Sequence, residues 1–153
     1  MHSEAHAFTS LNAWQALLDA HRDLFSDLAP GAWLGVVPRF RTDAEGARHS
    51  LAVADTPAVP MVVLLREDEH MTARAGEYRG LKATDADALL VADEASLGRC
   101  FEGTPERALR EIKGCVRSGA VALFFLRTRR ELFERGYEEL FDALGLPFLG
   151  SCR

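Results

Sequence analysis

The sequence predicts an α+β protein: a mixed or antiparallel sheet of about four to five strands with helices packed on at least one face. Three observations lead to this prediction. The apolar runs 61–65 and 120–126 have the length and composition of buried strands. Segments with helical periodicity lie before, between and after them. The length of 153 residues is that of one ordinary domain, so we expect a single compact domain over 1–153, with 1–8 a loose terminus.

The C-terminal segment gives the clearest pattern. The run 120–126 is bounded by Gly119 and Arg127 and predicts a strand buried on both faces. Thr128 and Glu131 have the spacing of a capping box, and the apolar residues that follow predict one helix up to Gly145. We therefore expect the strand residues to be among the most buried, with aromatic residues of the helices packed on the sheet. These residues are Leu123, Phe125, Val63 and Leu65 in the strands, and Trp14, Phe133 and Phe141 in the helices.

The N-terminal half alternates between helix and strand signals. An apolar stripe predicts a helix from Thr9 or Ser10 up to Pro30, with His21 at the border of the stripe rather than a ligand. Alternating polarity over 32–40 and the return at 50–54 predict a hairpin. The continuous run 61–65 predicts a central strand.

The middle of the chain is less clear. Residues 66–82 show no period and contain two glycines, which indicates a long loop of the kind that often carries function. The alanine content of 84–95 favours a helix, while a strand over 88–92 is the alternative that periodicity does not exclude. Thr104 and Pro105 then open a helix that Gly119 ends, with Cys115 on its buried face.

Composition narrows the class of protein. Hydrophobic residues make up 48% and charged residues 27% of the chain, which is typical of a globular protein, and no run is long enough for a transmembrane helix. Three widely spaced cysteines and the lack of a secretory signal predict a cytoplasmic protein without a disulfide framework, cofactor or metal centre. Only two of the 18 basic residues are lysines, a bacterial-like composition. The net charge of −5 argues against nucleic acid as a partner.

An arginine-rich turn is the first candidate site. Arg127, Thr128, Arg129 and Arg130 lie where the strand passes into the helix, and a helix N-terminus disfavours cations. An anion therefore has to compensate them. That anion is either a phosphate or carboxylate ligand, or protein carboxylates. Pairing with Glu131, Glu134 and other surface carboxylates is the simpler interpretation, and the acidic residues at 67–69 and 93–94 are a further internal source.

An acidic loop is the second candidate. Glu67, Asp68 and His70 follow the 61–65 strand directly, and Asp93 and Glu94 would complete a site if the fold brought them near. A solvated charge run is the simpler interpretation, since consecutive residues point in different directions. We predict no metal here.

No motif names a reaction, so the sequence assigns no catalytic residue and leaves open whether the protein is an enzyme. The patterns favour a small cytoplasmic domain that binds a protein partner or self-associates, for example as a homodimer, with no chemistry of its own. The alternative is a small enzyme or ligand sensor that binds a phosphate- or carboxylate-bearing molecule at 127–130.

Overall fold

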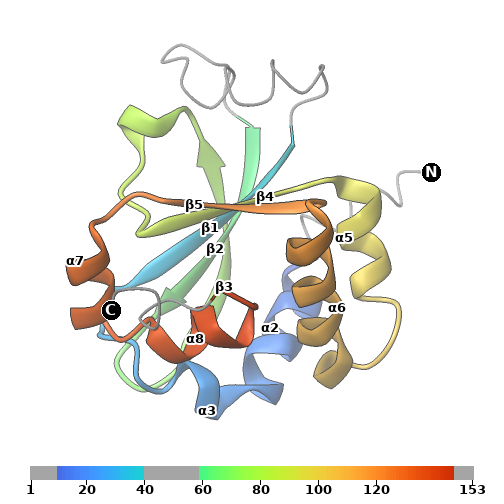
Figure 1. The fold of residues 1–153 in the computed structure, drawn as a ribbon, viewed down its shortest axis with the longest axis horizontal. Helices are drawn as coiled ribbons and strands as arrows, with labels where there is room; N and C mark the ends of the chain where they lie inside the picture. Colours follow the sequence, from blue (N-terminus) through green and yellow to red (C-terminus); the bar gives the residue numbers. More distant parts are fainter. Residues whose placement is uncertain (1–9, 40–58, 147–153) are drawn as a thin grey trace.

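A computed structural model describes residues 10–39 and 59–146. Its centre is a five-stranded mixed sheet of order β3-β2-β1-β4-β5 (Figure 1). β1 and β4 are parallel, and the other neighbouring strands are antiparallel. The strands are β1 (Trp33–Pro38), β2 (Val59–Arg66), β3 (Met71–Tyr78), β4 (Ala88–Ala92) and β5 (Val121–Phe125).

Helices cover one face of this sheet, as Figure 1 shows for α2, α3, α5, α6 and α8. None of the described helices has both the length and the apolar character needed to cross a membrane. The helices are α2 (Leu11–Ala20), α3 (Arg22–Phe25), α5 (Glu94–Cys100), α6 (Pro105–Ser118), α7 (Arg129–Glu134) and α8 (Glu138–Ala143), with a short 3-10 turn, η1 (Leu81–Ala83). The predicted α+β fold with a mixed sheet and helices on at least one face is confirmed.

The main core lies between the sheet and these helices. Trp14 of α2 and Phe141 of α8 are buried there, as predicted. A smaller apolar cluster lies on the opposite face of the sheet, where Leu81 and Ala86 from the segment between β3 and β4 pack against strand residues. β4 is buried on both faces because Leu90 belongs to the main core and Leu89 and Val91 to the cluster on the opposite face.

The predicted caps of α6 and α7 are confirmed, whereas Ser10 precedes α2 without a capping hydrogen bond from its side chain. Thr104 accepts a hydrogen bond from the backbone N–H of Arg107, with Pro105 opening α6, and Gly119 ends that helix with φ at 92°. Thr128 and Glu131 form the capping box of α7. These signals are local in sequence, so they specify helix ends without reference to the rest of the fold.

The prediction that 120–126 is a strand buried on both faces was wrong. β5 is an edge strand, so it lacks a neighbour on one side, and Phe125 is 46% exposed. Leu123 is half-buried in β5, as are Val63 and Leu65 in β2. Phe133 on α7 is 49% exposed rather than packed on the sheet.

Two further predictions for the middle of the chain were wrong. The segment 66–82 contains β3, which pairs with β2 along its whole length and carries polar residues because it is the other edge of the sheet. Gly76 lies in this strand. A side chain at this position would be crowded, since a Cβ would lie 2.8 Å from the Val63 side chain of β2. The segment 84–95 does not form the favoured helix. Residues 88–92 form strand β4, which is the alternative interpretation, and α5 begins at Glu94.

The predicted single helix after Thr128 is divided into α7 and α8. Gly136 separates them with φ at 86°, and a Cβ at this position would lie 1.9 Å from the carbonyl oxygen of Asp27. The chain therefore turns where it packs against the segment after α3. The predicted return strand 50–54 lies outside the described residues, and the antiparallel partner of β1 within them is β2.

Candidate functional site

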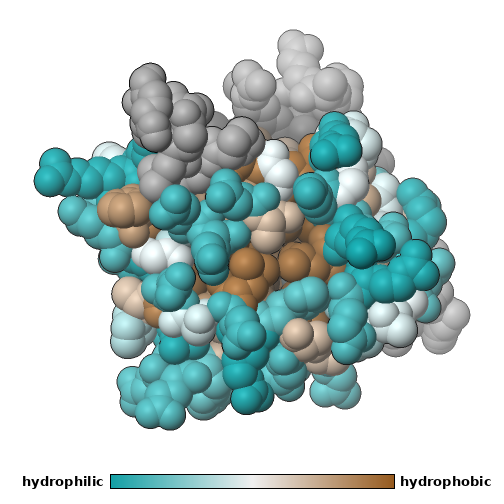
Figure 2. Space-filling model, turned by 60° about the horizontal axis from the view of Figure 1, so that its bottom comes forward, coloured by the Kyte–Doolittle hydropathy of each residue, from teal (hydrophilic) through white to brown (hydrophobic). Residues whose placement is uncertain are grey.

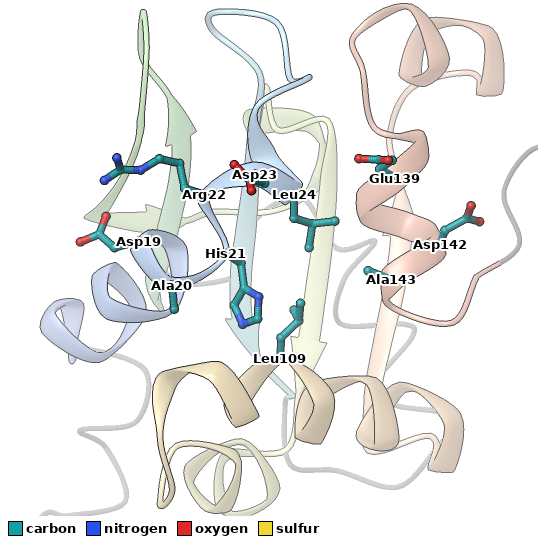
Figure 3. Close-up of a pocket in the computed structure, with 10 residues that line it drawn as sticks. All are labelled: Asp19, Ala20, His21, Arg22, Asp23, Leu24, Leu109, Glu139, Asp142 and Ala143. Carbon is teal, nitrogen blue, oxygen red and sulfur yellow. The ribbon is translucent and has the colours of Figure 1, made fainter.

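A groove of about 690 Å³ opens between the helices on the covered side of the molecule (Figure 3). One wall is the junction of α2 and α3, and the others are α6 and α8. The volume lies within the range of about 300–1,000 Å³ that is usual for ligand sites. The lining residues are Asp19, Ala20, His21, Arg22, Asp23, Leu24, Leu109, Glu139, Asp142 and Ala143.

The first wall exists because α2 ends and α3 begins at one residue. His21 has φ −117° and ψ 36°, outside the helical range, and its N–H still donates to the carbonyl of Leu17. Its own carbonyl accepts from the N–H of Leu24, which starts the next turn. The break turns the chain so that the His21 ring points towards Leu109 of α6 (Figure 3).

The rim of the groove is acidic. Asp19 and Asp23 stand on one wall and Glu139 and Asp142 on the other, and Arg22 is the only arginine or lysine among the described lining residues. Four carboxylates against one guanidinium give a local charge of −3 with histidine neutral. Within the described part of the chain, none of these carboxylates forms an ion pair, although Asp19 accepts a hydrogen bond from Gln15 at 3.1 Å.

The floor of the groove is apolar. Figure 2 shows apolar side chains at the bottom of a hollow that is surrounded by hydrophilic ones. Leu24 and Leu109 line the groove, and Leu109 also borders a small cavity of about 20 Å³ between the helices and the sheet. An apolar floor with a charged rim suits an amphipathic ligand better than a simple ion.

A buried polar atom lies in the same place. Nε2 of His21 is shielded from solvent and has no hydrogen-bond partner among the described residues. Buried polar atoms in native proteins usually have a partner, so an unpaired one in a groove is a point that a ligand or a water molecule can satisfy.

The arginine turn is engaged with the protein itself. Arg127 donates from Nε to Oδ1 of Asp87 at 3.0 Å and from Nη2 to the carbonyl of Asp85 at 3.2 Å. The hydrogen bond from Arg127 to Asp87 raises the pKa of the guanidinium further above its usual value. Asp87 is 1% exposed, and Arg135 approaches the same Oδ1 at 3.4 Å.

One side-chain hydroxyl and one backbone N–H complete the environment of Asp87. Its Oδ2 accepts from the hydroxyl of Tyr137 at 2.7 Å and from the N–H of Trp33 at 3.1 Å. Burial is the main cause that raises the pKa of Tyr137, and its hydrogen bond to Asp87 adds to the shift. This carboxylate therefore joins β1, β4, the start of α7 and the α7–α8 junction.

The remaining residues of the turn also have internal contacts. Arg130 pairs with Glu134 at 3.3 Å, and the Thr128 hydroxyl and the Glu131 carboxylate serve the capping box. Arg129 is likewise in contact with another group of the protein. The carboxylates that pair with Arg127 and Arg130 are Asp87 and Glu134, so residues 67–69 and 93–94 do not compensate these two arginines. The anion site at 127–130 stays a prediction.

The residues of the acidic loop are not brought together. Glu67 pairs with Arg74 and lies 3.4 Å from the His70 ring in the turn between β2 and β3, where Asp68 is exposed. Asp93 and Glu94 lie at the other end of the sheet from this turn. Ala88, the first residue of β4, is the one on the side of the turn, because it pairs with Leu34, which pairs with Leu64 near the end of β2. Asp93 and Glu94 follow Ala92, the last residue of β4. Asp93 instead caps α5 by accepting from Ser96, whose backbone hydrogen bond lowers the aspartate pKa.

No group of three or more metal-ligating side chains forms within the described ranges. The groove was missed by sequence reasoning, since its rim comes from 19–23 and 139–142 and no motif links these segments. The only sequence signal was the helical stripe that contains Leu24 and places Asp19 and Asp23 beside it.

The fold and the groove define the chain as an α+β protein with an acidic, apolar-floored groove on its helical face. No protein-family model matches the chain, and no curated protein matches it. Two solved structures resemble it over most of its length.

One of these structures is described as a UbiJ-SCP2 ubiquinone synthesis protein; it has 16% sequence identity and a TM-score of 0.40, and the match covers 95% of this chain and 93% of the other. The other is the solution structure of a conserved hypothetical protein from Thermus thermophilus, described as possibly a sterol carrier protein. Its identity is 17% and its TM-score 0.40, with 94% of this chain and 85% of the other covered. Likeness at this level assigns no family, so the proposals below depend on the chain's own residues.

Proposed function

We propose that this chain is a binding module whose groove between α2, α3, α6 and α8 receives a basic, amphipathic segment of a protein partner. The observation that supports this is the charge of the groove: four carboxylates without ion pairs among the described residues surround an apolar floor. Carboxylates that lack cations within their own fold attract lysine and arginine side chains of a partner. The floor gives the same segment a place for an apolar anchor.

The walls of the groove divide the roles in recognition. Asp19 and Asp23 on one side and Glu139 and Asp142 on the other would hold cationic groups along both edges of the bound segment. Leu109 would contact its apolar side chain. Because the carboxylates are exposed, their attraction is screened by salt, so binding should weaken as ionic strength rises.

A defined peptide tests this proposal. The probe is a synthetic helical peptide of lysine and leucine with a fluorescent label, and the readout is fluorescence anisotropy; a matched peptide with glutamate in place of lysine is the negative probe. The variant Asp23→Lys/Glu139→Lys should bind the basic peptide at least about tenfold more weakly, since it reverses charge on both walls.

A matched control separates the groove from overall charge. The variant Glu69→Lys/Glu102→Lys makes the same change in net charge at exposed sites outside the groove. It should keep the parent affinity within about threefold at moderate salt. Equal losses in both variants would mean that the peptide senses only net charge, and the groove would have no specific role.

A second candidate, self-association, is favoured by the edge of β5. Backbone groups of residues 120 and 126 form hydrogen bonds to the β4 side. Because successive residues of a strand point to alternate sides, the backbone N–H and C=O groups of 121, 123 and 125 point away from β4, to the open edge of the sheet. Phe125 on this edge is exposed, as is Phe133 of α7, and an exposed apolar edge is a template for strand pairing. Sedimentation of the parent and of Phe125→Lys over a range of concentrations tests it; a dimer that survives the lysine is not formed through this edge.

We further propose a cytoplasmic location for this function. The free thiols of Cys100 and Cys115 support it, since reducing compartments keep thiols unpaired. Fluorescence microscopy of a tagged chain in its own cell tests the location, and a signal confined to the cell envelope would contradict it.

A further inference from the structure

Two thiols from different helices meet where α5 packs on α6. Sγ of Cys100, the last residue of α5, lies 3.5 Å from Sγ of Cys115 in α6. Both cysteines are free. A disulfide bond is about 2.05 Å long, so the sulfurs need to approach by only about 1.5 Å, a distance within reach of side-chain rotation.

The two thiols differ in their access to solvent. Cys100 is 2% exposed, and its thiol donates to the carbonyl of Ser96 at 3.4 Å. Burial, followed by the hydrogen bond with Cys115, raises the pKa of Cys100 to about 12, so this residue stays protonated at neutral pH. Cys115 is partly exposed and is therefore the thiol that a small reagent meets first.

We propose that Cys100 and Cys115 form a modification site at which a hydroperoxide produces an intramolecular disulfide. Cys115 is the peroxide-attacking residue, and Cys100 is the resolving residue behind it. This inference is independent of the proposed binding function, because neither cysteine lines the groove.

The reaction balances with hydrogen peroxide as the oxidant. The Cys115 sulfur attacks one peroxide oxygen, the O–O bond breaks, and Cys115 sulfenic acid and one water molecule form. The Cys100 sulfur then attacks the sulfenic sulfur, the S–O bond breaks, and the hydroxide leaves as a second water molecule with the Cys100 proton. The two thiols lose two electrons in total, and the peroxide gains them.

The disulfide would close the loop between residues 100 and 115 and lock α5 to α6. By the chain-entropy relation, a loop of this length contributes about 3 kcal/mol, so the thermal midpoint should rise by about 6–12 °C. A thiol reductant should reverse the rise.

The test uses the full chain carrying Cys152→Ser, which removes the third cysteine of the sequence. After treatment with hydrogen peroxide, the intact mass should fall by two hydrogen atoms. Tryptic digestion should yield a cross-link between peptides 100–107 and 114–117, which reduction separates. The same mapping on the parent keeps the test available if this variant folds poorly.

Two further variants assign the roles. With Cys100→Ser, the peroxide should leave a sulfenic acid on Cys115 that dimedone traps, because no resolving thiol remains. With Cys115→Ser, Cys100 should react at least about tenfold more slowly, because it is buried and protonated. The proposal is overturned if the parent accumulates sulfinic acid at Cys115 without a cross-link, if the cross-link forms only in denaturant, or if both variants oxidise at the same rate.

Discussion

Replacing Asp87 with alanine should destabilise this protein more than almost any other single change to a charged residue. The carboxylate is 1% exposed and accepts hydrogen bonds from the Tyr137 hydroxyl, the Trp33 N–H and the Arg127 guanidinium, with Arg135 close by. Removing it leaves the buried Tyr137 hydroxyl and the Trp33 N–H without their acceptor. Breaking such a buried pair costs about 3–5 kcal/mol in the free energy of unfolding.

The two arginines moderate this estimate. Their side chains are 33% and 38% exposed, so water can replace part of what Asp87 provides to them. Most of the cost therefore arises from the tyrosine and the backbone N–H. At about 2–4 °C per kcal/mol for a chain of this size, the thermal midpoint should fall by about 6–20 °C.

A double-mutant cycle with Tyr137→Phe measures the coupling. That variant alone removes one hydrogen bond to a charged group and should cost about 1.5–3 kcal/mol. Combined with Asp87→Ala, it removes the orphaned hydroxyl, so the double variant should lose at least about 1 kcal/mol less than the sum of the two single changes. Urea unfolding followed by circular dichroism gives these values. A loss below about 1 kcal/mol for Asp87→Ala, or strict additivity, would refute the reasoning.

Three further predictions concern the sheet edge, a helix cap and the arginine turn. Gln15→Ala should cost about 1–2 kcal/mol in urea unfolding and increase dimerisation in light scattering, because the Gln15 amide hydrogen-bonds to the outer edge of β3; unchanged values would contradict this. Asp93→Ala should cost about 1 kcal/mol near neutral pH. Its folded pKa lies below the usual 3.8, so the stabilisation is present above that value and is lost as pH falls through the folded pKa; thermal melts should show the two proteins converging in acid, and a pH-independent gap would argue against it. The anion-site prediction requires the parent melting temperature to rise with phosphate and Arg129→Ala/Arg130→Ala to lack that rise; no response in the parent removes the site.

Local signals in the sequence were sufficient for the start and end of α6 and for the start of α7. Thr104 and Pro105, and Thr128 with Glu131, act through hydrogen bonds within a few residues, so each cap is specified without knowledge of its neighbours. The α+β class followed from the same kind of pattern. The break at Gly136 did not, because it depends on a close approach to Asp27, far away in the sequence.

The order of the strands in the sheet could not be predicted from the sequence, because it depends on pairing between segments that are far apart in the chain. An apolar run such as 121–125 reads as central, yet β5 lies at the edge and exposes Phe125. β3 reads as a loop because an edge strand tolerates polar residues and Gly76 has no side chain to contribute to a pattern. For 88–92, a short alanine-containing run fits helix and strand equally, and pairing with β1 decided it.

The candidate sites divide in the same way. The helix dipole predicted that an anion lies near Arg127. The sequence did not identify this anion as Asp87 rather than another carboxylate, because the two residues are 40 positions apart in the chain. The sequence showed only three widely spaced cysteines, and the distance between the sulfurs of Cys100 and Cys115 depends on how α5 packs on α6. The groove likewise needs four helices in place before its acidic rim exists.

The central claim is that the groove binds a basic amphipathic segment, and nuclear magnetic resonance locates such binding directly. Backbone amide shifts of the isotopically labelled chain would be followed during titration with the lysine–leucine peptide. The account predicts that the largest shift changes fall on residues 19–24, 109 and 139–143, saturate, and shrink as salt is added. Changes that gather on the β5 edge around Phe125 and Phe133, or that spread evenly over the surface, would contradict it.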